Sequence, residues 1–218
     1  WLVIANGHGA TFGVWSDLFR LLSQDIRILI WHYRGQHTSD LPADPRANSI
    51  DDHCDDLDLL LDALGVERYV MAGWSIGVQI ALGQYRRSPQ KVDGLILIHG
   101  APDRLVSRVF GGGARRLLHP SVRMARHTAP WVVPVIKPFI KRWLRSRTAL
   151  PVFKGIGLID VDSEDFRQLA LDYADLDYGA YMQMVLSAHG HRTEDWLHEI
   201  NVPTLVTVGH RDGLTPPH

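Results

Sequence analysis

Ser75 is the residue whose type and spacing best suit nucleophilic chemistry. It stands at the centre of Gly73-Trp74-Ser75-Ile76-Gly77, which follows the apolar run Tyr69–Ala72 and precedes a helical pattern over Val78–Arg87. A serine between two glycines at a strand-to-helix turn is held in a strained backbone with its hydroxyl clear of the sheet, and the helix N-terminus favours negative charge nearby. We interpret Ser75 as a nucleophile. The alternative is a glycine-rich turn in which the serine is incidental.

The elements that must position this turn are short apolar runs alternating with helical patterns. Each run is rich in valine and isoleucine or otherwise apolar throughout, which is typical of strands buried on both faces of a parallel sheet. The predicted strands are Leu2–Ala5, Ile26–Trp31, Tyr69–Ala72, Val92–Ile98 and Thr204–Val208. The alternation predicts an α/β fold, with a mostly parallel sheet and helices on both of its faces.

The clearest helix is predicted over Ser49–Leu64. Ser49 with Asp52 three residues later is a capping pattern, and Gly65 stands where a C-terminal glycine belongs. Apolar residues recur at helical spacing and predict one buried stripe. The stripe consists of Ile50, Cys54, Leu57, Leu61 and Leu64.

The alternation stops between residues 102 and 201, where helical stretches occur without convincing strand runs. We therefore predict that residues 1–101 form the first part of the α/β core and that residues 102–201 form an inserted helical cap or lid. Residues 202–218 are expected to resume the core. The apolar start at Trp1 and the Pro-Pro pair before His218 suggest a chain truncated at both ends.

The predicted insertion divides sharply by charge. From Asp103 to Arg147 there are eleven Lys or Arg residues and one acid, whereas Ile159–Glu199 holds ten acids and two arginines. We expect the two halves to attract each other. Two interpretations stay open: the basic half is an ordinary solvated helix face, or it meets an anionic substrate or a lipid head group.

Composition limits the remaining classes of partner. With 23 Lys and Arg against 24 Asp and Glu, the chain has no global field for nucleic acid or for an anionic membrane. The single cysteine, Cys54, excludes an internal disulfide framework and fits a reducing, cytoplasmic setting. His189 and His191 lack a partner at ligand spacing, so we expect no metal, and no motif implies a cofactor. The longest uncharged apolar stretch, His127–Ile136, is too short to span a bilayer.

On these motifs the chain resembles the α/β-hydrolase fold superfamily, over nearly all of its length outside Pro102–Asn201. Asn6–Trp15 resembles the family's oxyanion loop, and Arg34-Gly35 with Ser39 resembles the loop after the next strand. Three positions depart from the family pattern, which often has histidine, aspartate and glycine where this chain has Asn6, His32 and His37.

The resemblance implies a catalytic set. The backbone N–H groups of His8 and Ile76 would form the oxyanion hole, and Asp212, after the strand Thr204–Val208, would be the acid of the triad. Asp103 is a weaker candidate for the acid. The family's chain order places the catalytic histidine after the acid, where His218 falls too early. We therefore expect that histidine beyond residue 218.

We expect the other histidines in loops or on the surface. The imidazole of His8 either touches the substrate or packs in the mouth of its loop.

The function expected from this resemblance is hydrolysis of a carboxylic ester or thioester through an acyl-enzyme on Ser75. The expected partner is a small-molecule ester, with peripheral lipid contact through the basic insertion left open. Carbon–carbon bond hydrolases, lactonases and perhydrolases share these motifs and stay as alternatives. So does a non-catalytic binding protein of the same fold, which would explain the absent histidine without truncation.

Overall fold

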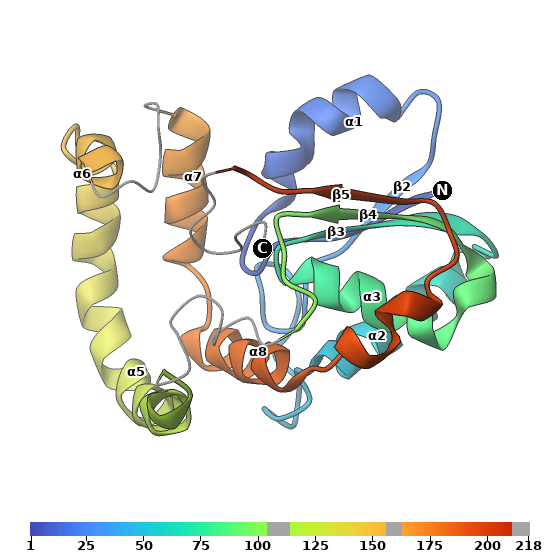
Figure 1. Cartoon of the computed structure of the whole chain (residues 1–218). Coiled ribbons are helices and arrows are strands. Elements are labelled where there is room, and N and C mark those ends of the chain that lie inside the picture. The colour runs from blue at the N-terminus through green and yellow to red at the C-terminus, as the bar shows by residue number, and fades with distance from the viewer. Residues whose placement is uncertain (104–113, 156–162, 211–218) are drawn as a thin grey trace.

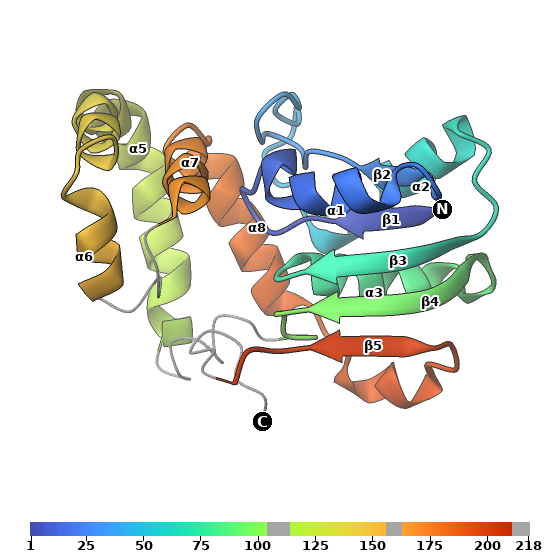
Figure 2. The ribbon, with the colours of Figure 1, turned by 90° about the horizontal axis from the view of Figure 1, so that it is seen from above.

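A computed structural model describes residues 1–103, 114–155 and 163–210 of the chain, so Asp212 and His218 lie outside the described residues. Five strands form one sheet in the order β2-β1-β3-β4-β5, and every neighbouring pair is parallel (Figure 2). The strands are β1 (Leu2–Ala5), β2 (Ile28–Ile30), β3 (Tyr69–Trp74), β4 (Val92–Ile98) and β5 (Thr204–Thr207). The predicted parallel sheet is confirmed.

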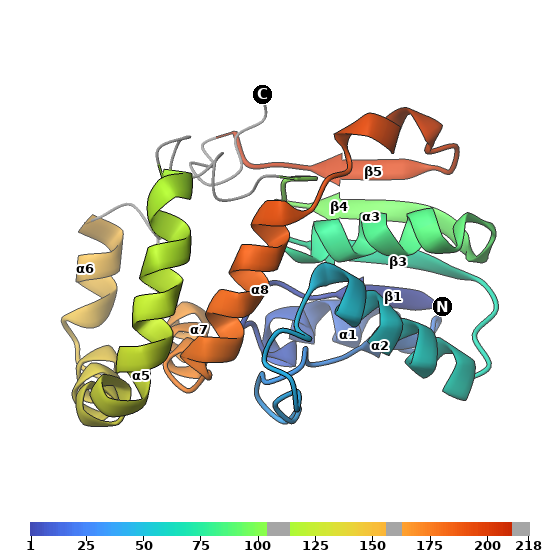
Figure 3. The same cartoon turned by 90° about the horizontal axis from the view of Figure 1, so that it is seen from below.

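Helices cover both faces of this sheet, as predicted. Helix α1 (Ser16–Leu22) lies on one face, whereas α2 (Ile50–Ala63) and α3 (Gly77–Arg87) lie on the other (Figures 1 and 3). The described residues also form three short 3₁₀ turns. They are η1 (Phe12–Trp15), η2 (Pro89–Lys91) and η3 (Glu194–Glu199).

Helix α2 shows the predicted capping and most of the predicted stripe. The Ser49 hydroxyl accepts from the Asp52 N–H at 3.1 Å, and the Asp52 carboxylate accepts from the Ser49 N–H at 2.8 Å. Leu64 was expected in the stripe but is 49% exposed, because the helix ends one residue earlier and the chain turns away through Gly65 at φ +63°. His53 is buried in the helix face instead.

The prediction that the strands are buried on both faces is confirmed at the centre of the sheet and wrong at its edges. Every residue of β1 is buried, whereas Leu205 and Val206 of β5 are exposed. β2 and β5 are the outermost of the described strands. The strand predicted over Ile26–Trp31 is also shorter, at three residues.

Among the described residues, four helices lie between β4 and β5 in the chain and stand beyond the C-terminal ends of the strands (Figure 2). They are α5 (Ala114–Leu144), α6 (Ala149–Gly155), α7 (Glu164–Tyr173) and α8 (Tyr178–Gly190). The basic and acidic halves meet as their charges predict, because Lys137 and Lys141 both pair with Asp175, at 2.9 and 2.6 Å. Among the described residues, no helix is long and apolar enough to cross a membrane.

The C-terminal part of this helical segment packs into the main hydrophobic core of the protein. Met184 and Ala188 of α8 and Trp196 of η3 pack in the same buried cluster as Leu57 of α2 and Met71 of β3. The segment is therefore anchored on the sheet-covering helices rather than standing apart. Its limits as a separate cap, 102–201, stay a prediction.

Candidate active site

Ser75 occupies a strained turn between β3 and α3. Its φ is +57°, a left-handed conformation that non-glycine residues rarely adopt and that clusters at functional sites. Two backbone hydrogen bonds fix the turn: the Ser75 N–H donates to the Ile98 carbonyl at 2.9 Å, and the Val78 N–H donates to the Ser75 carbonyl at 3.1 Å. The side chain is half-buried at the C-terminal end of the sheet.

The glycines on either side of Ser75 are required by close backbone approach. A Cβ at Gly77 would lie 2.0 Å from the carbonyl oxygen of Ala5 in β1, and a Cβ at Gly73 would lie 2.4 Å from the Gly77 carbonyl oxygen. Both obstacles are backbone atoms that cannot rotate away. The motif therefore brings α3 directly against the ends of β3 and β1.

The loop after β1 is held by Asn6. Its side-chain oxygen accepts from the Gly7 N–H and from the Trp15 indole N–H, each at 2.9 Å, and its side-chain nitrogen donates to the Ala10 carbonyl at 2.8 Å. The Tyr33 hydroxyl also donates to the Asn6 carbonyl at 2.7 Å. One buried side chain thus ties together the loop in which the family often has histidine.

The hydrogen bonds of this loop leave one amide open. The Gly7 N–H donates to Asn6, the Gly9 N–H to the side-chain oxygen of Gln36 at 2.9 Å, and the Ala10 N–H to the Gly7 carbonyl at 3.1 Å. The His8 N–H has no hydrogen-bond partner in the part of the chain that the structure describes. Such an unused donor is what an oxyanion hole needs.

A second open amide lies beside Ser75. The Ile76 N–H has no hydrogen-bond partner within residues 1–103, 114–155 and 163–210 either, and it directly precedes the first turn of α3. The two amides belong to neighbouring strand ends, because Ala5 of β1 is in register with Gly73 of β3. The structure thus brings His8, Ser75 and Ile76 together at the C-terminal edge of the sheet.

The imidazole of His8 is buried against aromatic residues. It lies flat on the ring of Tyr181, with centroids 3.8 Å apart and planes 7° from parallel. Burial, and secondarily the charge of His53, lowers the pKa of His8 to about 3. The ring is therefore neutral at physiological pH and a weak proton acceptor, which does not suit a general base. Between the two roles expected for this imidazole, the packing favours a structural one.

Helices α7 and α8 hold the same loop from the other side. The Tyr173 hydroxyl donates to the His8 carbonyl, and the Thr11 hydroxyl donates to the Asp172 carboxylate at 2.9 Å. A Cβ at Gly9 would lie 2.5 Å from the Leu176 side chain, so these helices pack directly on the loop. Sequence reasoning missed Tyr173, Tyr181 and Gln36, since no local pattern links them to His8.

Two histidines of the loop after β2, at positions that depart from the family pattern, pack against the loop after β1. His37 has φ +51°, which explains why the family often has glycine there, and its Nε2 lies 3.0 Å from the Gly9 carbonyl oxygen. His32 stacks on Phe12 at 3.9 Å, and its Nδ1 lies 2.8 Å from the Thr38 hydroxyl. Both departures from the family pattern therefore have local packing reasons.

The acid and base of the predicted triad are not placed. Asp212 lies outside the described residues, while Asp103, the weaker candidate, is fully buried shortly after β4.

The expectation that the other histidines lie in loops or on the surface is wrong for His53 and His189, which are buried in α2 and α8. A polar residue on an apolar stripe was the available signal for His53. No cluster that could hold a metal occurs among the described residues.

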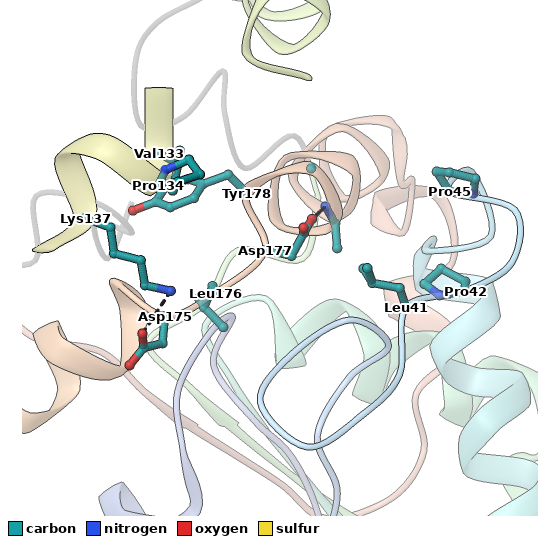
Figure 4. Close-up of a pocket in the computed structure, with 12 residues that line it drawn as sticks. Leu41, Pro42, Pro45, Val133, Pro134, Lys137, Asp175, Leu176, Asp177 and Tyr178 are labelled. Atoms are coloured by element: carbon teal, nitrogen blue, oxygen red, sulfur yellow. Dashed lines mark hydrogen bonds and ion pairs between the residues drawn. The ribbon is translucent and has the colours of Figure 1, made fainter. Parts of the chain in front are cut away.

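A pocket of about 640 Å³ lies between α5, the turn from α7 to α8 and the loop after β2 (Figure 4). Leu41 and Pro42 form one wall, Val133 forms another, and the ion pair of Lys137 with Asp175 lies at one end. Ser75, His8 and Ile76 do not line it. Leu176 lines the pocket and also packs on Gly9, so one side chain lies between this space and the loop after β1.

Known proteins resemble this chain in both sequence and fold. A protein of Azorhizobium caulinodans named carbamate hydrolase RutD is 23% identical over 99% of the chain and 74% of its own length. The pimeloyl-[acyl-carrier protein] methyl ester esterase of Nitrosomonas europaea is 31% identical over 46% of the chain and 37% of its own length. The chain likewise spans between 36% and 49% of several other curated relatives.

The fold is shared with solved structures and with a family model. The crystal structure of a hydrolase from Pseudomonas aeruginosa superposes with a TM-score of 0.73 at 19% identity, covering 99% of this chain and 74% of that one. The model of the alpha/beta hydrolase fold family matches residues 1–218. With its parallel sheet and its strained serine turn, this chain belongs to the alpha/beta hydrolase fold family.

Proposed function

We propose that the protein hydrolyses a carboxylic ester or thioester through an acyl-enzyme on Ser75. The observation that carries the proposal is the arrangement at the strained Ser75 turn. The backbone N–H groups of His8 and Ile76 lie at the same edge of the sheet, and neither has a hydrogen-bond partner among the described residues. A tetrahedral oxyanion needs two such donors near the nucleophile, and each is worth a few kcal/mol in the transition state.

The proposed reaction has two halves. The Ser75 oxygen attacks the substrate carbonyl, the His8 and Ile76 N–H groups donate to the resulting oxyanion, and its collapse expels the alcohol or thiol. Water then attacks the acyl-serine through a second oxyanion in the same hole, which releases the acid and restores the serine.

Proton transfer in both halves requires a base near Ser75. We propose a histidine beyond residue 218 that Asp212 orients, in the family's order of serine, acid and histidine. The depressed pKa of His8 supports this assignment, because His8 would be a poor base at neutral pH.

The names of the relatives support acyl chemistry in general rather than one substrate. One relative is named an esterase of a pimeloyl methyl ester, and others are named carbamate hydrolases. All such substrates have a carbonyl group that a nucleophile can attack, and Ser75 with the His8 and Ile76 N–H groups would serve that step. We propose that the helical segment 102–201 selects the acyl or alcohol part.

The experiment that tests this proposal is labelling of the protein with a fluorophosphonate probe. Ser75→Ala is expected to abolish labelling and ester turnover, whereas Ser23→Ala, at an exposed serine after α1, should leave both unchanged. Labelling of Ser75→Ala equal to that of the parent protein would remove Ser75 as the nucleophile.

A further inference from the structure

The outer face of α5 is apolar and exposed. Helix α5 bends sharply along its length (Figures 1 and 2). Trp131, Val135 and Phe139 follow one another at steps of four residues, so they form one line along the helix, and Met124 stands seven residues before Trp131. All four are exposed, Trp131 by 80% and Phe139 by 71%. We call this line, with the adjoining exposed Val132, Ile136 and Ile140, the outer face of α5.

The opposite side of α5 makes contacts with the rest of the protein. Lys137 and Lys141 pair with Asp175, Val133 lines the pocket beside the α7–α8 turn, and Leu144 is buried. The C-terminal part of α5 stands at the side of the molecule remote from the sheet (Figure 1). Its orientation is therefore fixed by contacts on the inner side. Contiguous apolar surface of this extent on a folded protein marks an interaction site.

The charged residues of α5 itself have one sign. Helix α5 contains seven Lys or Arg residues and no Asp or Glu over its 31 residues. Arg142, Arg145 and Arg147, at its C-terminal end and just beyond, are exposed, and none has an ion pair within the described ranges. An occupant of this face must therefore accept large apolar side chains and supply negative charge at its border.

We propose that the outer face of α5 docks on the surface of an anionic lipid bilayer. A helix that carries tryptophan and phenylalanine on one face and Lys or Arg around it lies in the plane of such an interface, with its apolar side chains between the acyl chains and its cations at the head groups. Trp131 and Phe139 supply the first feature and Arg142, Arg145 and Arg147 the second.

A second copy of the chain fits this face less well. Two outer faces packed together would place the arginines of one helix near those of the other, and α5 has no carboxylate to compensate them. The anionic head groups of a bilayer supply that compensation.

The test is flotation of the purified protein with vesicles. We expect binding to vesicles of phosphatidylcholine mixed with phosphatidylglycerol, much weaker binding to phosphatidylcholine alone, and a loss of binding at high salt. The experiment is run on Ser75→Ala as well as on the parent protein, since docking through α5 does not depend on the proposed chemistry.

Variants separate the two contributions to binding. Trp131→Ser combined with Phe139→Ser should lower the partition coefficient by about tenfold or more. Arg142→Gln and Arg145→Gln should each lower binding to anionic vesicles by about fivefold. Leu59→Ser is the matched control, since Leu59 is 69% exposed on α2, and it should bind like the parent protein. Circular dichroism checks that each variant keeps the parent's helix content.

Three results would overturn the proposal. The first is a protein that binds neither kind of vesicle. The second is binding that is equal for neutral and anionic vesicles. The third is a dimer, detected by light scattering, that Trp131→Ser converts to a monomer, because the face would then serve a second copy of the chain.

Discussion

The imidazole of His8 lies parallel to the phenol ring of Tyr181, 3.8 Å away between centroids. The two residues are separated by most of the chain, yet their stacking joins the loop after β1 to helix α8. The neighbouring Tyr173 of α7 donates its hydroxyl to the carbonyl of the same His8. The proposed oxyanion donor is thus held by two tyrosines from the helical segment between β4 and β5.

This clamp predicts that Tyr173→Phe impairs catalysis. The Tyr173 hydroxyl fixes the His8–Gly9 peptide, whose N–H is held by Gln36, so its loss should loosen the adjoining His8 N–H. We expect kcat to fall by about tenfold with little change in KM, since a weakened oxyanion donor acts mainly in the transition state. Tyr178→Phe, at a residue that lines the separate pocket, is the control. Equal kinetics for Tyr173→Phe and the parent protein would contradict the clamp.

Two of the buried histidines, His8 and His53, predict a stability that depends on pH. Burial lowers the pKa of His8 to about 3 and that of His53 to about 4, from 6.5. The unfolded chain therefore binds more protons than the folded one between about pH 3 and 6.5, and the free energy of unfolding decreases as pH falls through this window. Each histidine contributes a slope of at most about 1.4 kcal/mol per pH unit.

Urea unfolding at a series of pH values measures this slope. His53→Gln removes one of the two titrating groups and should flatten the curve between about pH 4 and 6.5. The same substitution at His198, which is exposed, serves as the control. A slope that His53→Gln leaves unchanged would show that His53 does not titrate abnormally.

Gly77→Ala is expected to be strongly destabilising. The added methyl group would lie 2.0 Å from the Ala5 carbonyl oxygen, and this backbone atom belongs to a buried strand that cannot shift alone. We expect a loss of about 3 kcal/mol or more in the free energy of unfolding. Gly155→Ala, where a Cβ meets nothing within 4 Å, should change stability little. Thermal or chemical unfolding of both variants provides the comparison.

Asn6→Ala is expected to disorganise the loop after β1. It would leave the Gly7 N–H and the Trp15 indole N–H without their acceptor and the Ala10 carbonyl without a donor. Leaving such buried groups unsatisfied should cost about 2–3 kcal/mol and reduce ester turnover. Asn6→Asp keeps one acceptor oxygen but places a second carboxylate oxygen against the buried Ala10 carbonyl, so it should also be destabilising. The proposed role of Asn6 is wrong if both variants unfold like the parent protein.

The sequence by itself determined the features that depend on local pattern. Continuous apolar runs indicated β1, β3 and β4, and the Ser49–Asp52 pair indicated the start of α2, because strand burial and helix capping act within a few residues. The glycines around Ser75 likewise indicated the turn, since they must admit a helix against a strand. Asp212 and a histidine beyond residue 218 stay predictions.

Only the tertiary structure decided what surrounds these elements. Tyr173 and Tyr181 stand 165 and 173 positions after His8 in the chain, yet both contact it in the fold. No local periodicity encodes that pairing. His53 was expected, with the other histidines, in a loop or on the surface, but packing against Tyr33 inside the core buries it. The outer face of α5 could not be told from its inner face by composition, because both carry apolar residues. Which face stays exposed is set by the ion pairs of Lys137 and Lys141 with Asp175, a contact between distant parts of the chain.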